Sequence, residues 1–86
     1  MDIVYSTKFG REYKKLSKHI KATAEQQEII FRINPFDQKL KTHKLNGKFN
    51  EFLSFSIGYK YRIIFEFSKD KKTAYFHSVG DHDVYQ

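Results

Sequence analysis

Four side chains of this sequence could together cleave RNA without a metal ion. His43 opens "HKLNG", Arg62 lies within "YKYRIIF", and His82 and Tyr85 belong to the last eight residues, "VGDHDVYQ". Cleavage of RNA through its own 2′-hydroxyl needs a base for that proton, an acid for the departing 5′-oxygen and fixed cations for the phosphorane. Histidine suits both proton transfers, because its ordinary pKa of about 6.5 leaves both protonation states populated near neutrality.

Each of these four residues also has a purely structural interpretation. Arg62 can be a solvated strand residue or the ion-pair partner of Glu66. His43 can be a surface residue of a lysine-rich connector, and His82 a turn residue bonded to a neighbouring aspartate. Tyr85 can simply cover an open end of a sheet. Taken singly, each residue leaves both interpretations open.

The other two histidines are interpreted as structural. His19 falls on a basic helix face and His77 within a strand. No histidine spacing matches the ligand pattern of a metal site, and the chain contains no cysteine. The sequence therefore predicts neither a metal nor any other cofactor.

The positive charge is concentrated in the first half of the chain. The formal net charge is +6; residues 1–48 carry eleven Lys/Arg and five Asp/Glu, whereas residues 49–86 carry five of each. Such a field attracts polyanions, either nucleic acid or an acidic protein, although a merely soluble basic surface has the same composition. If the partner is RNA, the candidate phosphate contacts are Lys41, Lys44, Lys48 and Lys60.

Length and composition predict one cytoplasmic domain that covers residues 1–86. A chain of 86 residues is too short for two cores, and its nine Phe and six Tyr supply the large side chains of one. The lack of cysteine fits a reducing compartment. No apolar run approaches the roughly 18 residues of a membrane span, and the start lacks the plan of a signal peptide. We therefore expect no membrane partner.

The elements that position the four residues begin with a strand and two helices. "DIVYS" alternates like a strand, and Ser6 or Thr7 can cap a helix. "TAEQ" is typical of a capping box and predicts that a second helix begins at Thr23. "NP" at 34 and 35 ends that helix. The apolar stripe of the first helix consists of Phe9, Tyr13, Leu16 and Ile20.

From "HKLNG" onward the apolar pattern has a period of two, which predicts strands. Asn46-Gly47 favours a tight hairpin turn, and Gly58 turns the chain between two further strands. "TAYFHSV" has aromatic residues on both faces, which places the last strand inside the sheet. The core-facing residues of the two middle strands are Phe49, Leu53, Phe55 and Ile57, and Tyr59, Tyr61, Ile63, Phe65 and Phe67.

This order predicts a two-layer α+β fold, in which an antiparallel-rich sheet (β-α-α-β-β-β) packs on an N-terminal helical hairpin. The helices cover one face of the sheet. The other face is expected to be free, polar and partly basic, and so able to bind a ligand. By parity it carries Ser54, Ser56, Lys60, Arg62, Ile64 and Glu66.

At "HKLNG", "YKYRIIF" and "VGDHDVY" the sequence resembles the RelE/ParE superfamily of bacterial toxins, which act in toxin–antitoxin pairs. The resemblance covers essentially the whole chain and implies a twisted, antiparallel-rich sheet on a helical hairpin. The chain departs from the family at "LSFSI", where Ser54 and Ser56 stand in place of lysines of RelE. The YafQ type has a further histidine where this chain has Ser56. A lysine-based mechanism is therefore not implied.

The resemblance implies a role for each of the four residues. His43 is similar to a histidine of YafQ-type and a glutamate of YoeB-type messenger RNA endonucleases, which implies a general base. Arg62 resembles the arginine that RelE-type and YoeB-type members direct at the scissile phosphate. His82 falls near the C-terminal histidine of the YafQ and YoeB types, a candidate acid. Tyr85 resembles the late tyrosine of RelE.

Together these residues imply a ribosome-dependent messenger RNA endonuclease that halts translation, and a cognate antitoxin whose acidic segment neutralises it. Two alternatives stay open. ParE-type members share the fold and poison DNA gyrase, but they generally lack the paired histidines. An inactive member would serve only as a binding module.

Overall fold

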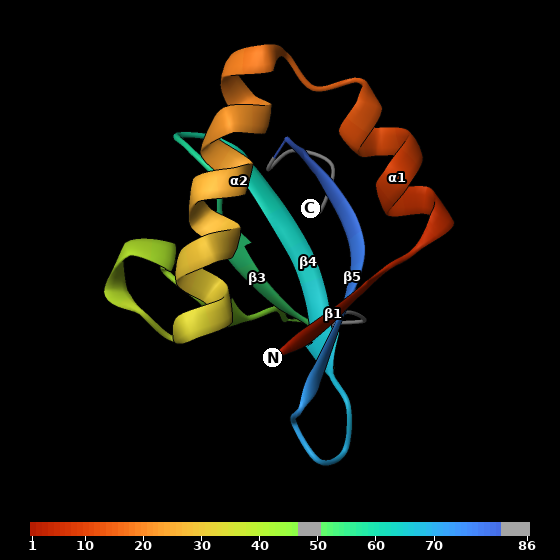
Figure 1. Cartoon of the computed structure of the whole chain (residues 1–86), viewed down its shortest axis with the longest axis vertical. Coiled ribbons are helices and arrows are strands. Elements are labelled where there is room, and N and C mark those ends of the chain that lie inside the picture. Colours follow the sequence, from red (N-terminus) through yellow and green to blue (C-terminus); the bar gives the residue numbers. More distant parts are fainter. Residues whose placement is uncertain (47–50, 82–86) are drawn as a thin grey trace.

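Two helices arch over one face of a five-stranded sheet (Figure 1). The computed structural model describes residues 1–46 and 51–81. Within these residues, no helix combines the length and the hydrophobicity of a membrane span. The elements are β1 (Asp2–Tyr5), α1 (Thr7–Lys14), α2 (Lys18–Ile33), the 3-10 helix η1 (Gln38–Leu40), β2 (His43–Lys44), β3 (Leu53–Ser56), β4 (Tyr61–Phe67) and β5 (Thr73–Asp81).

The sheet has the strand order β1-β5-β4-β3-β2. Strand β1 is parallel to β5, and every other neighbouring pair is antiparallel. The predicted α+β fold with an antiparallel-rich sheet is thus confirmed, as is the internal position of the last strand. The short strand β2 adds one strand to the predicted order.

The first helix begins where the sequence predicts and the second does not. The Ser6 hydroxyl caps α1 by accepting a hydrogen bond from the Phe9 amide at 2.9 Å. Helix α2 begins after Ser17, not at Thr23, because the Ser17 hydroxyl caps the Ile20 amide at 3.2 Å. The apolar stripe continues across this break, so hydrophobic periodicity alone hides the boundary.

Thr23 lies inside α2, so the predicted capping box is wrong. Its hydroxyl donates to the His19 carbonyl at 3.2 Å, a bond that Thr often makes within a helix. The other end of α2 is as predicted. Ile33 is the last helical residue, and Asn34 is extended before Pro35.

The core between the helices and the sheet is largely aromatic. Phe31 of α2 stacks on Phe55 of β3 with ring centroids 4.9 Å apart. The same ring meets Phe65 edge-on at 5.0 Å and Phe76 at 5.3 Å. All four side chains are fully buried. Edge-to-face and offset pairs of this kind stabilise a core beyond the area they bury.

Tyr59 was predicted to lie in the core but is fully exposed, at 101%. The Ile57 amide donates to the Tyr61 carbonyl at 3.0 Å, so Gly58, Tyr59 and Lys60 form the turn before β4. Gly58 has a φ of 104°, which a residue with a side chain rarely adopts. The predicted core residue Phe49 and the Gly47 of the predicted tight turn lie outside the described residues.

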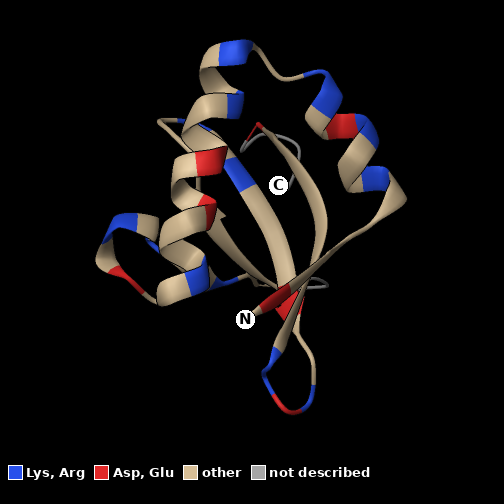
Figure 2. Cartoon of the chain, in the orientation of Figure 1, with Lys and Arg blue, Asp and Glu red and all other residues tan. Residues whose placement is uncertain are grey.

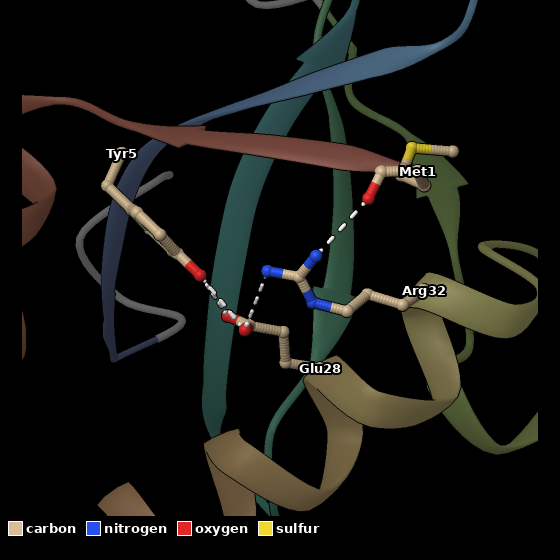
Figure 3. A network of polar contacts seen from close by, with 4 residues as sticks. All are labelled: Met1, Tyr5, Glu28 and Arg32. Atoms are coloured by element: carbon tan, nitrogen blue, oxygen red, sulfur yellow. Dashed lines mark hydrogen bonds and ion pairs between the residues drawn. The ribbon is translucent and has the colours of Figure 1, made fainter.

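A polar network ties β1 to α2 at the edge of the sheet (Figure 3). The Tyr5 hydroxyl bonds to the Glu28 carboxylate with both oxygens at 2.9 Å. Arg32 pairs with the same carboxylate at 3.5 Å and donates to the Met1 carbonyl at 3.2 Å. Burial, followed by the hydrogen bond and charge of Glu28, raises the pKa of Tyr5 above its ordinary value.

The sheet face opposite the helices, here called the polar face, is not open throughout. Ser54, Ile64 and Ser78 form a row across β3, β4 and β5, and each is at most 4% exposed. The prediction of a wholly free face is therefore wrong at its centre. Exposed positions lie on either side of this row.

Candidate functional site on the polar face

Strand pairing arranges the polar face in three rows. In the first row Arg62 lies between Ser56 and Gly80. The middle row is Ser54, Ile64 and Ser78, with His43 beyond Ser54 on β2. In the third row Glu66 lies beside Tyr75.

Arg62 has small neighbours and no charged partner within the described part of the chain. Ser56 lies on one side and Gly80 on the other, and Arg62 is partly exposed. Basic segments lie mainly on the helices and loops (Figure 2), and Arg62 is the only Lys or Arg of β4. The suggested ion pair with Glu66 is not formed, because that carboxylate bonds to His77 instead. A guanidinium without a counter-ion among these residues is suited to bind a phosphate.

His43 is exposed on the edge strand β2, and a backbone bond orients its ring. Its Nδ1 lies 3.0 Å from the Lys41 carbonyl oxygen, to which it can only donate. In a neutral ring this bond fixes the proton on Nδ1 and leaves Nε2 with a free lone pair. Lys41 has a φ of 54°, the left-handed conformation that ends η1. The arrangement is that of a ring prepared to accept a proton.

The segment before His43 is held by side chains of the helical layer and of the segment itself. Gln27 of α2 donates to the Lys39 carbonyl at 3.1 Å and to the Ser56 carbonyl at 3.0 Å. Asp37 caps η1 through the Lys39 amide, and the Thr42 hydroxyl donates to the Pro35 carbonyl at 2.6 Å. These bonds fix η1 relative to β3 and so fix the place where His43 enters the sheet.

His43 and Arg62 are separated by two strand spacings and by two residues along β4. Ideal sheet dimensions give roughly 12 Å between their Cα atoms. Both residues are assigned to the polar face, since His43 pairs with Ser54, whose neighbours Leu53 and Phe55 face the core. A phosphate group held by the long Arg62 side chain can therefore lie between the two.

The candidate phosphate-binding lysines differ in their surroundings. Lys41 is exposed beside His43. Lys44 pairs with Leu53, which puts it on the helical side of the edge strand. Lys60 is exposed and lies 3.6 Å from the Asp81 carboxylate. Lys48, His82 and Tyr85 lie outside the described residues.

His77 is on the polar face and was not singled out by the sequence. Its Nε2 lies 2.9 Å from Oε2 of Glu66, and its ring meets Phe52 edge-on at 4.9 Å. The strand register shifts at this point, so that Ile64 pairs with Ser78 and Phe65 with Phe76. His77 is therefore the extra residue of a β-bulge, which re-aims a side chain.

A signal of this bulge was present in the sequence. The buried apolar residues of β5 are spaced by two from Ala74 to Phe76 and then by three to Val79. Such a break in a period of two indicates an inserted residue. The interpretation of His77 as an ordinary strand residue missed it.

A cavity of about 370 Å³ opens on the other side of the sheet, between α1 and α2. It is lined mainly by apolar and tyrosine side chains, with Glu25 and Glu28 as its charged residues. No basic or histidine side chain is among the described residues that line it. Within residues 1–46 and 51–81, no cluster of side chains could hold a metal ion.

Comparison with solved structures shows a known fold. The chain is similar to a YoeB/ParE toxin from Agrobacterium tumefaciens, with a TM-score of 0.79 and 15% identity over 95% of this chain and 99% of that one. It is also similar to YafQ from E. coli strain BL21(DE3), with a TM-score of 0.78 and 20% identity over 96% and 94% of the two chains.

A third similar structure is the RelBE2 toxin–antitoxin complex from Mycobacterium tuberculosis, with a TM-score of 0.77 and 16% identity over 93% and 95% of the chains. No protein-family model matches the sequence, and no curated protein matches it either. Identities this low establish the fold alone. The chain has the fold of the RelE, YafQ and YoeB toxins.

Proposed function

We propose that this chain is the toxin of a bacterial toxin–antitoxin pair and cleaves messenger RNA on the ribosome. The observation that carries the proposal is the guanidinium of Arg62, which has no ion-pair partner among the described residues. It lies on the same sheet face as His43, whose Nε2 is left free to accept a proton. The fold shared with the toxins above supports the same assignment.

In the proposed reaction His43 removes the proton of the RNA 2′-hydroxyl. The resulting oxyanion attacks the adjacent phosphorus, and Arg62 stabilises the phosphorane charge. His82 protonates the departing 5′-oxygen, and Tyr85 stacks on a neighbouring base. The products are a 5′-hydroxyl and a 2′,3′-cyclic phosphate, or the 3′-phosphate formed by its hydrolysis. Phosphates along the message contact the predicted lysines Lys41, Lys48 and Lys60, whereas Lys44 faces the helical side of the edge strand.

The proposed partner is an antitoxin with an acidic segment. The similar structures include the toxin–antitoxin complexes RelBE2 from M. tuberculosis and DinJ–YafQ from E. coli. A net charge of +6 speeds the encounter with such a segment. We propose that the segment covers the Arg62 side of the polar face and so blocks the message.

Transcript mapping after brief induction in bacteria tests the function. Wild type should create new 5′-hydroxyl ends within translated messages, and Arg62→Ala should lower their number by about 10² to 10³. Arg11→Ala, which removes an exposed charge from α1, is the matched control and should keep wild-type ends. Intact transcripts together with arrested DNA supercoiling would instead indicate a gyrase-binding toxin. Intact transcripts with normal growth would indicate a binding module.

A further inference from the structure

We propose that Phe52, Glu66, Tyr75 and His77 form a subsite that holds one base of the message beside the cleaved phosphate and prefers guanine. The inference rests on the proposed function, since it names a feature of the RNA that the same face would cut. The four side chains come from the neighbouring strands β4 and β5 and from the residue before β3. None of them belongs to the proposed reacting set.

The four side chains form one row across the polar face. The pairing of Leu53 with Phe65 puts Phe52 opposite Glu66, which in turn pairs with Tyr75. The bulge brings His77 into the same row, where its Nε2 lies 2.9 Å from Oε2 of Glu66. Phe52 meets the His77 imidazole edge-on at 4.9 Å and so fixes the plane of that ring.

The row is accessible to a ligand. The side chains of Glu66 and His77 are each 40% exposed, and Tyr75 is 38% exposed. The middle row is buried in contrast. An exposed pair of a charged and an aromatic group, with a second ring beside it, is the arrangement by which proteins read unstacked RNA bases.

Helix α1 holds the bulge in place. Strand β1 ends at Tyr5, so the backbone of β5 beyond Phe76 has no strand on that side. The Ser6 hydroxyl donates to the His77 carbonyl at 2.8 Å, and the Glu12 carboxylate accepts from the Val79 amide at 3.0 Å. Both backbone groups of the bulge region are thereby satisfied, which keeps His77 aimed at Glu66.

Glu66 determines which base fits. An ionised carboxylate only accepts hydrogen bonds, and after the His77 bond it keeps further acceptor positions. Guanine presents two adjacent donors, N1–H and the N2 amino group, on its Watson–Crick edge. Uracil presents one donor between two carbonyl oxygens, which the carboxylate repels. Adenine and cytosine each place a ring acceptor next to their single amino group. Guanine is therefore the best match.

The position of the row assigns the base to a flanking nucleotide. Arg62 and Glu66 are four residues apart on β4, which corresponds to about 13 Å along the strand. A base bound at Glu66 cannot belong to the phosphate held at Arg62 without a sharp fold of the nucleotide. It belongs to a neighbour along the message, so the subsite selects where the chain cuts.

The first test compares the bases around transcript ends for wild type and Glu66→Gln. The glutamine keeps the acceptor for His77 but adds a donor, which suits adenine as well as guanine. Wild type should show guanine enriched about tenfold over uracil at one flanking position, and Glu66→Gln should lose most of that enrichment. Glu25→Gln, on the opposite side of the sheet, is the matched control and should retain it. Equal enrichment in wild type and Glu66→Gln would overturn the subsite, as would no enrichment.

A binding measurement separates this inference from the proposed function. Purified full-length protein is titrated with 2′-O-methyl RNA tetramers, which resist cleavage and differ only by guanine or uracil at one position. The guanine tetramer should bind about tenfold more tightly and shift the NMR signals of the His77 and Tyr75 rings. Glu66→Gln should reduce that ratio severalfold. If wild type cuts no message, this preference still supports the subsite, whereas equal affinities of the two tetramers overturn it.

Discussion

The two faces of strand β4 differ in how their side chains are fixed. Toward the helices, Ile63 and Phe65 are buried in an aromatic core that holds them by packing from several sides. On the polar face, Arg62 and Glu66 are partly exposed and depend on backbone features nearby. Packing tolerates many combinations of apolar residues. A site tolerates few, because a small displacement of one group changes its chemistry.

The backbone features around the polar face are local and specific. They are the left-handed Lys41 that turns the chain toward His43, the bulge at His77 and the cap at Ser6 that also holds this bulge. Each positions one side chain of the face. The comparison of the two faces predicts that substitutions in the core reduce stability, whereas substitutions on the polar face reduce activity.

Replacing Phe31, the ring at the centre of the core, should have the largest effect on stability. Phe31→Ala removes a fully buried side chain that contacts three other buried rings, and should lower the free energy of unfolding by about 3–5 kcal/mol. Urea unfolding followed by circular dichroism measures it. Phe36→Ala, at a mostly exposed ring, is the control and should cost less than about 1 kcal/mol. Similar losses for the two variants would contradict the packing described here.

Replacing the proposed base should leave the fold intact and slow cleavage. His43→Ala removes a side chain whose ring makes one exposed hydrogen bond, and the rate should fall by about 10² to 10⁴. Wild type should show a bell-shaped dependence of rate on pH, and His43→Ala should remove its acidic limb because the base must be deprotonated. His82→Ala should remove the basic limb. His19→Ala on α2 should retain the whole bell, and loss of the opposite limb in His43→Ala would reverse the two roles.

A substitution at the centre of the polar face should increase stability. Ser54 is fully buried, and its hydroxyl has no hydrogen-bond partner in the described part of the chain. A buried unpaired hydroxyl is unfavourable, so Ser54→Ala should raise the free energy of unfolding by up to about 1 kcal/mol. The adjacent core variant Phe55→Ala should lower it by about 3–5 kcal/mol. Destabilisation by Ser54→Ala, measured in urea, would show that its hydroxyl is satisfied.

The smallest expected effect is on the pH dependence of the free energy of unfolding, through Tyr5 at the edge of the sheet. The pKa of Tyr5 is raised in the folded chain by burial and by Glu28, so its neutral form is favoured there. This contribution is complete below the unfolded pKa of about 10 and is lost as pH rises through the higher folded value. Tyr5→Phe should remove that dependence and cost less than about 1 kcal/mol, because the hydrogen bond is exposed. Tyr59→Phe, at a fully exposed ring, should leave the dependence unchanged in thermal unfolding between pH 8 and 11.

The core face was readable from the sequence because it repeats. Three local sequence rules were sufficient here. They are the alternation of Ile63 and Phe65 along a strand, the helix N-cap at Ser6 and the helix end before Pro35. The start of α2 was not readable, because the apolar stripe continues through the break and Ser17 and Thr23 are both plausible caps.

The polar face was readable only in part. Parity along β4 correctly separated Arg62 and Glu66 from the core, but it could not show that Glu66 bonds to His77 across a bulge. The burial of Ile64 is also invisible to a rule of alternation. Contacts of this kind depend on strand register, which a single sequence does not determine where both faces carry mixed residues.

We propose that the polar face is a catalytic site, and measuring rate and stability on the same purified Arg62→Ala protein tests this proposal. Cleavage of ribosome-bound message should fall by about 10² to 10³, while the free energy of unfolding in urea should change by no more than about 0.5 kcal/mol. Wild-type cleavage by Arg62→Ala would contradict the account, as would a loss of stability large enough to explain the loss of rate.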